Sequence, residues 1–195
     1  MPRALTEQEK DRQYKKLLEK GVEAILSYGI RKVSIDDITK AANMAKGTFY
    51  HHFDSKEKFM IEVIIGLHRQ IFARAEQILL DEQNLRDNIK GFMLKLFHMP
   101  EMIFFIKHYS EINELVDTLS DQEARATDQI EVDMFEKLLT TLGINTLKVK
   151  PGVVHNYMHT FYMIMGCDLM IAEDLPETVE LIIDSLISYV SGGIQ

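Results

Sequence analysis

Hydrophobic residues recur along most of the chain at intervals of three and four, the spacing that places them on one face of an α-helix. Leu18, Val22, Ile25 and Leu26 show this pattern near the N-terminus. No segment alternates hydrophobic and polar residues over the length of a strand, and no internal repeat is present. We therefore predict an all-α fold, with helices over residues 6–29, 34–42, 45–52, 56–80, 84–98, 100–118, 121–142, 151–173 and 176–191.

Residues with capping preferences mark where several of these helices begin and end. Thr6 and Glu9 have the spacing of a capping box, and the Ser34 hydroxyl can accept a hydrogen bond from the free amides of the next helix. Asn43, between two short helices, tolerates the left-handed backbone that a tight turn requires. Prolines are favoured in the first turn of a helix, where a missing amide costs nothing. Three of them fall at predicted helix starts: Pro100, Pro151 and Pro176.

The two short helices, residues 34–42 and 45–52, have the length and spacing of a helix-turn-helix motif. The outward face of the second carries the residue types that contact DNA: amines, hydroxyls and imidazoles for base edges and phosphates, and a glycine that lets the backbone approach. Lys56 can meet a phosphate together with the free amides of the following helix. Singly, each could be an ordinary solvated residue. The other candidates are Lys46, Gly47, Thr48, Tyr50, His51 and His52.

Residues Ser34–Glu57 read SIDDITKAANMAKGTFYHHFDSKE, and this string closely resembles the DNA-binding signature of the TetR family of one-component repressors. The resemblance extends over about the first 60 residues. It implies a helix-turn-helix domain over residues 1–56 and an effector-binding and dimerisation domain over residues 57–195. It also implies roles for single residues. Lys46, Gly47, Thr48, Tyr50 and His51 would lie in or beside the major groove, and Ser34, Tyr50, His52 and Lys56 would hold phosphates.

Two positions depart from the family pattern. Asn43 stands where a glycine is common, and Asn can adopt the required backbone at modest strain. Ala45 stands where a serine often caps the recognition helix, so a side-chain cap is not expected there.

Charge is unevenly distributed between the two predicted domains. Residues 1–58 hold 12 Lys and Arg against 9 Asp and Glu, a balance of +3, whereas the remaining residues hold 10 against 21, a balance of −11. A mildly basic head on an acidic body indicates that only the head meets a polyanion, although a balance of +3 could also arise by chance.

The body lacks the spacings of a Ser/His/Asp triad, a phosphate-binding glycine loop, or an HExxH or CxxC metal motif. It is instead rich in Met and aromatic residues, which can line an adaptable apolar pocket or simply pack the core. Residues 151–173 are apolar on nearly all sides and should be buried on more than one side. The candidate ligand-binding residues are Phe97, Met102, Phe105, Tyr109, Met134, His155, Met158, His159 and Tyr162.

Polar groups within that apolar segment have three possible roles. His155, His159 and Tyr162 share one helix face, at i, i+4 and i+7. They can be satisfied core groups, pocket residues that orient an effector, or metal ligands, since two histidines at i and i+4 can share an ion. Metal binding is the least favoured of the three, and we expect neither a metal nor a cofactor.

The last predicted helix carries a continuous hydrophobic stripe, which can seal the core or join a second copy of the chain. The family resemblance implies that the last two long helices pair with their two-fold mates in a four-helix dimer interface. The candidate interface residues are Val179, Ile182, Ile183, Leu186, Ile187 and Val190.

The sequence thus predicts a homodimeric repressor that a small apolar or amphipathic ligand releases from a palindromic operator. The helix over residues 56–80 would transmit the change. The alternatives are a small-molecule-binding protein or enzyme that acts without operator-specific binding, and an architectural DNA binder, which the acidic body disfavours. A single cysteine, Cys167, and a charged N-terminus without an apolar run indicate a cytoplasmic protein with no membrane partner. Because the body lacks a catalytic motif, we expect a regulator and not an enzyme.

Overall fold

A computed structural model describes residues 5–80, 85–96, 98–167 and 170–193. These residues form ten α-helices and no strand, which confirms the predicted all-α fold. The helices are α1 (Glu7–Tyr28), α2 (Ile35–Ala41), α3 (Lys46–His52), α4 (Lys56–Leu80), α5 (Leu85–Leu96), α6 (Pro100–Lys107), α7 (Tyr109–Val116), α8 (Asp121–Thr141), α9 (Pro151–Met165) and α10 (Leu175–Ser191).

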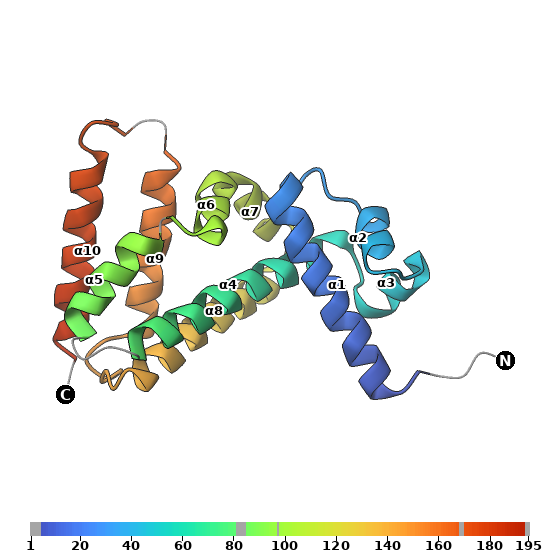
Figure 1. Cartoon of the computed structure of the whole chain (residues 1–195), viewed down its shortest axis with the longest axis horizontal. Helices are drawn as coiled ribbons and strands as arrows, with labels where there is room; N and C mark the ends of the chain where they lie inside the picture. Colours follow the sequence, from blue (N-terminus) through green and yellow to red (C-terminus); the bar gives the residue numbers. More distant parts are fainter. Residues whose placement is uncertain (1–4, 81–84, 97, 168–169, 194–195) are drawn as a thin grey trace.

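The molecule has a small helical head and a larger helical body (Figure 1). Helices α1, α2 and α3 form the head, and α5, α9 and α10 lie at the opposite end. Helices α4 and α8 pack side by side and run between the two ends. In the part of the chain that the structure describes, no helix combines the length and the apolar character needed to cross a membrane.

The predicted helix starts agree closely with the structure. Thr6 and Ser34 both form complete capping boxes, with Glu9 and Asp37 as their partners. Helices α6, α9 and α10 each hold a proline in the first turn, as the sequence indicates. Local side-chain chemistry therefore determines these boundaries.

Two predicted helices are shorter than expected. The one over residues 100–118 breaks at His108, whose backbone leaves the helical region (φ −109°, ψ 16°), and the break directs α7 toward the head. The one over residues 151–173 ends at Met165, because Gly166 follows as its C-cap and packs against another backbone. A Cβ atom at Gly166 would lie 3.1 Å from the carbonyl oxygen of Ile106.

The head has its own aromatic core, built from Phe49, Phe53 and Phe59, whose ring centroids lie 4.8–5.3 Å apart. Helices α1 and α4 cross closely because Gly21 presents no side chain there. Phe59 and Val63 belong to α4, so the core of the head extends past the domain boundary predicted at residue 56.

Ion pairs and packing connect the head to the body. The guanidinium of Arg31 lies 2.9 Å from the carboxylate of Glu114 in α7, and Lys58 lies 3.1 Å from Glu123 in α8. The ring of His108 packs against Gly29, at the end of α1. The helix over residues 56–80 is therefore not the sole physical route between the two parts.

Candidate DNA-binding surface and interior cavity

The turn between α2 and α3 has the backbone that the sequence predicts. Asn43 has a positive φ of 54°, in the left-handed region. The amide of Met44 then donates to the carbonyl of Thr39 at 2.8 Å, which closes the turn. Helix α3 begins at Lys46, and its N-cap residue Ala45 supplies no side-chain hydrogen bond, as expected.

Buried aromatic residues fix which face of α3 points outward. Phe49 is fully buried, and Phe53, at i+4, is buried directly after the helix. The opposite face is therefore free, since residues three or four apart share a face. Four of the predicted DNA-binding residues are exposed on α3: Lys46, Gly47, Tyr50 and His51.

Lys46 has an acidic neighbour on the same surface. Its Nζ atom lies 2.9 Å from Oδ1 of Asp36 in α2, and both side chains are exposed. The hydrogen bond to Asp36, together with its charge, raises the pKa of Lys46. This amine is thus already partnered by a carboxylate before any DNA is bound.

The other predicted DNA-binding residues lie around this face and are either half-buried or already hydrogen-bonded. Ser34 is exposed, but its hydroxyl caps α2 by accepting from the amide of Asp37. Thr48 and Lys56 are half-buried. His52 is also half-buried, with Nε2 3.3 Å from Oε1 of Gln13 in α1. Burial, aided by the nearby charge of His51, lowers the pKa of His52.

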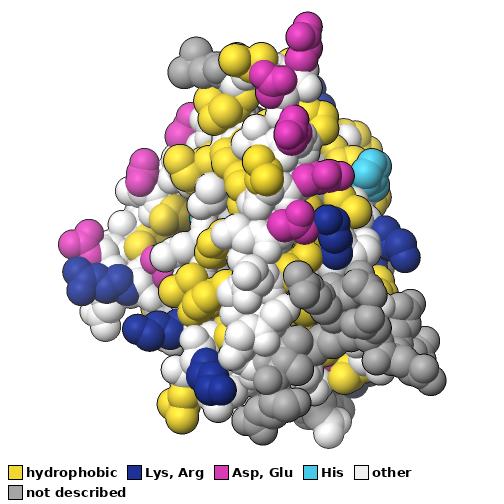
Figure 2. All heavy atoms as spheres, turned by 90° about the vertical axis from the view of Figure 1, so that its left-hand side faces the viewer, with side chains coloured by type: hydrophobic (Ala, Val, Ile, Leu, Met, Phe, Trp, Pro, Cys, Tyr) yellow, Lys and Arg dark blue, Asp and Glu magenta, His cyan; other side chains and the backbone are white. Residues whose placement is uncertain are grey.

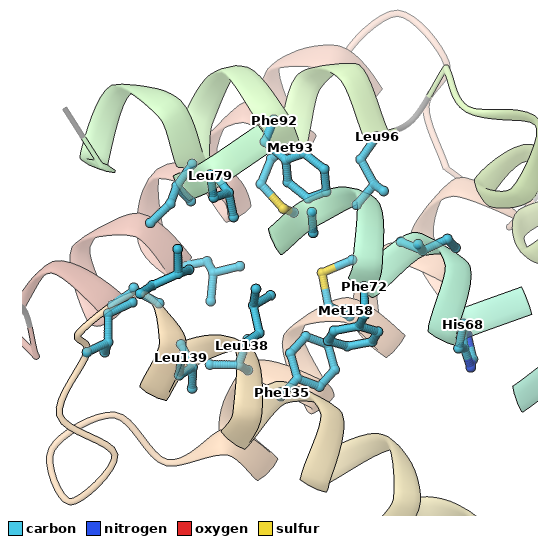
Figure 3. A pocket seen from close by; sticks show the side chains of 18 of the residues that line it. His68, Phe72, Leu79, Phe92, Met93, Leu96, Phe135, Leu138, Leu139 and Met158 are labelled. Atoms are coloured by element: carbon cyan, nitrogen blue, oxygen red, sulfur yellow. The ribbon is translucent and has the colours of Figure 1, made fainter. Parts of the chain in front are cut away.

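The body contains an apolar cavity of about 90 Å³ (Figure 3). Helices α4, α5 and α8 supply most of its wall, and α9, α10, Met102 of α6 and the segment after α8 contribute the remainder. His68 lies at one end and brings an imidazole into a lining that is otherwise apolar except for Tyr162. The chemistry of this cavity suits an apolar molecule with few polar groups.

Three of the nine predicted ligand-binding residues line the cavity: Met102, Met158 and Tyr162. Phe105, Tyr109, Met134, His155 and His159 do not, and Phe97 lies outside the described residues. Sequence reasoning missed the larger share of the wall, because cavity-lining and core residues have the same hydrophobic pattern. The missed residues include His68, Phe72, Ala75, Leu79, Phe92, Met93, Leu96, Phe135, Leu138 and Leu139.

His155 and His159 instead meet a buried carboxylate behind the cavity. Their Nε2 atoms lie 3.2 and 3.4 Å from Oε2 of Glu131 in α8. Nδ1 of His68 lies 2.8 Å from Oε1 of the same carboxylate, as an ion pair outside hydrogen-bond geometry. Burial of Glu131 opposes its ionisation, but the charge of His68 and the contacts of the histidines prevail and lower its pKa. Burial, and then the charge of Glu131, raise the pKa of Tyr162.

The hydrophobic stripe of α10 faces the protein's own interior. Val179, Ile183, Leu186, Ile187 and Val190 are buried within one chain, and only Ile182 is partly exposed. The prediction that these residues contact a second copy of the chain is therefore corrected. They pack inside the chain, where Leu186 and Val190 line the cavity. The stripe follows the core because α10 packs on α5 and α9.

The outward face of α9 and α10 forms a separate shallow groove. Figure 2 views the molecule from the end at which α10 lies and shows hydrophobic side chains there, with acidic and basic side chains among them. In the groove the hydroxyls of Tyr157 and Ser185 are hydrogen-bonded at 2.9 Å, and Leu181 is 65% exposed. The groove is lined by Val153, Asn156, Tyr157, Thr160, Thr178, Leu181, Ile182 and Ser185.

Helices α2 and α3, with their tight turn and exposed second helix, define the class of helix-turn-helix DNA-binding proteins. Residues 17–63 match the family described as "Bacterial regulatory proteins, tetR family". The chain thus carries the DNA-binding domain of the TetR family, which confirms the resemblance seen in the sequence.

Regulators from other bacteria are similar to parts of this sequence, and a solved structure shares its fold. The chain is 31% identical over 85 residues to the transcriptional repressor KstR2 of Mycobacterium tuberculosis, a match covering 44% of this chain and 42% of that repressor. It is 22% identical over 138 residues to the regulator YhgD of Bacillus subtilis, covering 70% and 72%. A TetR-family regulator from Pectobacterium atrosepticum has the same fold, with a TM-score of 0.64 at 16% identity, over 97% of this chain and 98% of that one.

Proposed function

We propose that this protein is a sequence-specific DNA-binding transcriptional repressor that acts as a homodimer. The observation that carries the proposal is the exposed face of α3, where Lys46, Tyr50 and His51 surround an unobstructed Gly47. A backbone free of side chain can approach a phosphate or base edge closely, and the flanking groups supply donors. The second observation is the match of residues 17–63 to a family of regulators.

The dimer would form through the outward face of α9 and α10. This face presents Leu181, Ile182 and Thr160 to solvent beside the Tyr157–Ser185 hydrogen bond. A two-fold axis there would use the same surface on both copies. The two α3 helices would then insert into successive major grooves, about 34–36 Å apart, on a palindromic site.

The cavity would bind a small apolar or amphipathic effector. Its present volume of about 90 Å³ is smaller than the roughly 300–1,000 Å³ of drug-sized ligand sites. A larger effector would therefore have to displace α5 or α10, whose side chains form part of the wall.

Helix α4 would carry that displacement to the head. Its residues Ile71, Ala75 and Leu79 line the cavity, while Phe59 and Val63 pack in the core of the head. An effector that binds the DNA-incompatible arrangement about 100-fold more tightly would weaken operator binding by up to about 2.7 kcal/mol.

The first experiment is selection of bound fragments from the source organism's genomic DNA at near-physiological salt. We expect a few fragments that share an inverted repeat. Tyr50→Ala and Lys46→Ala should each weaken binding to that repeat without loss of helical content. Tyr28→Ala and Lys148→Ala are the matched controls, since both residues are exposed and lie outside α2 and α3. Wild-type affinity in both test variants would show that α3 does not read the DNA.

The same experiment separates the alternatives. A small-molecule-binding protein without an operator would enrich no fragment. An architectural binder would retain all fragments, with strong salt dependence but no preference among sequences.

The effector site is tested with a series of straight-chain alcohols and carboxylic acids of increasing length, by thermal unfolding. Binding to the folded state raises the melting temperature. Ala75→Leu places a larger side chain in the cavity wall and should abolish the shift. Ala126→Leu, on the exposed surface of α8, is the control. An equal shift in Ala75→Leu would place the binding site elsewhere.

A further inference from the structure

Three side chains from two helices converge behind the cavity with the chemistry of a metal site. Glu131 comes from α8, and His155 and His159 lie one turn apart on α9, on the same face. One ligand atom from each residue lies within 4.8 Å of the other two. Imidazole nitrogens and a carboxylate oxygen are ligands that zinc and similar divalent ions prefer.

We propose that Glu131, His155 and His159 bind a divalent transition-metal ion, with Zn²⁺ as the expected occupant. In a tetrahedral zinc site with bonds of about 2.0–2.1 Å, ligand atoms are about 3.3 Å apart. Oε2 of Glu131 lies 3.2 Å from Nε2 of His155 and 3.4 Å from Nε2 of His159. Two of the distances between ligand atoms thus already match a tetrahedral site. Only the distance between the two histidine nitrogens would have to adjust when an ion binds.

The surroundings hold the carboxylate in position for an ion. Oε1 of Glu131 is occupied by Nδ1 of His68, at 2.8 Å, which leaves Oε2 to face the two histidines. The ring of His68 is in turn stacked on Phe105, with centroids 4.1 Å apart and planes 10° apart. Metal-binding carboxylates and histidines are commonly fixed by such outer partners.

The cluster is accessible to an ion on the side of His159, where a fourth coordination position is also open. Glu131 and His155 are buried, whereas the side chain of His159 is 37% exposed. An ion can therefore enter from this side, and a water molecule can serve as the fourth ligand. A bound ion would link α8 to α9 next to the cavity wall formed by Met158 and Tyr162.

The test uses the full chain without a histidine tag, freed of metal and dialysed against Zn²⁺. We expect one ion per chain by elemental analysis, and the visible absorption of tetrahedral cobalt when Co²⁺ replaces zinc. His159→Gln should weaken binding on the order of 10–100-fold or more. His98→Gln is the matched control, because it removes an exposed imidazole that lies outside the cluster.

His159→Gln is chosen because its exposed side chain makes misfolding a lesser concern than for the buried Glu131. Circular dichroism checks that it folds, and thermal unfolding gives a second readout. Zn²⁺ should raise the melting temperature of the wild-type and His98→Gln proteins but not that of His159→Gln. Absence of saturable binding, or equal affinity in the two variants, would overturn the proposal. Neither result bears on the repressor proposal, since the readout is metal binding itself.

Discussion

Single residues in the head are constrained by how closely their neighbours approach. Gly21 lies where α1 crosses α4, and Asn43 holds the left-handed turn between α2 and α3. Asp36 has a different constraint, because its carboxylate pairs with Lys46 on the proposed DNA-binding face. Gly21 and Asp36 each lead to a prediction that a one-residue change can test.

Gly21→Ala should destabilise the fold by roughly 1–3 kcal/mol, as overpacking substitutions do. The added Cβ would lie 2.5 Å from Cγ2 of Val63 and 2.8 Å from Cζ of Phe59. Gly66→Ala is the control: nothing lies within 4 Å of its added Cβ, and the helical propensity of Ala should stabilise α4 by roughly 0.5–1 kcal/mol. Urea unfolding measures both, and equal effects would contradict the close crossing.

Asp36→Asn should strengthen DNA binding several-fold. It removes a negative charge that would face phosphates, and it releases Lys46 from its ion pair. Asp184→Asn removes an equivalent Lys–Asp pair, with Lys90, at the opposite end of the molecule and should leave DNA affinity unchanged. Affinity is measured by fluorescence anisotropy over a range of salt concentrations. No gain in Asp36→Asn would mean that Lys46 does not contact DNA.

At the scale of elements, helix ends determine how the head and body are organised. Complete capping boxes begin α1, α2 and α8, whereas α3 begins without one. The cap of α8 also joins the body to the head, because its Glu123 meets Lys58 of α4. Substitutions at these helix ends should affect the stability of one helix and of the helix that it contacts.

Ala45→Ser should stabilise the protein by about 1 kcal/mol, since a serine hydroxyl at the N-cap accepts from the free amides of α3. Ala41→Ser is the control, because the same change falls at the C-terminal end of α2, where no N-cap is formed. The stabilities of the two variants are compared by the midpoints of their denaturant unfolding curves, provided that the dependence of the unfolding free energy on denaturant is unchanged. If the two variants are equally stable, the absence of a cap does not limit α3.

Glu123 should titrate at about pH 2. Hydrogen bonds from Ser120, and then the bond and charge of Lys58, lower its pKa from the ordinary 4.5. The contribution of this carboxylate to stability is therefore complete above pH 4.5 and is lost as the pH falls from 4.5 toward 2. Carboxyl-carbon NMR measures the pKa, which Lys58→Met should raise only part of the way, because the bonds from Ser120 remain. A pKa of 4.5 in the wild type would contradict the cap.

At the scale of the whole molecule, the two ends of one chain carry the two proposed surfaces. The head presents α3, and the opposite end presents the outward face of α9 and α10. Helices α4 and α8, the Arg31–Glu114 pair and the packing of His108 on Gly29 connect them. Coupling between effector and DNA would thus depend on several contacts rather than on α4 alone.

Leu181→Glu should weaken the proposed dimer at least about 10-fold, since two-fold symmetry would bury two copies of the new charge in one interface. Leu5→Glu is the control, because Leu5 is also exposed but precedes α1 at the head. Sedimentation velocity over a range of protein concentrations gives the monomer–dimer equilibrium. An unchanged dimer in Leu181→Glu would exclude this face as the interface.

The sequence by itself determined the local features of this protein. The three-and-four spacing of hydrophobic residues predicted the helices, Thr6 and Ser34 predicted their caps, and Asn43 predicted the turn. The signature from Ser34 to Glu57 identified the helix-turn-helix domain. These features depend on residues close together in the chain, so their physical causes can be read directly from the order of the residues.

Only the tertiary structure decided which hydrophobic faces meet. The stripe of α10 could have faced a partner, but it packs inside the chain, and the cavity wall comes chiefly from helices that had no distinguishing sequence pattern. Glu131 showed no sequence relation to His155 and His159, although all three meet in space. Hydrophobic burial is non-directional, so the pattern determines that a face is buried but not what covers it.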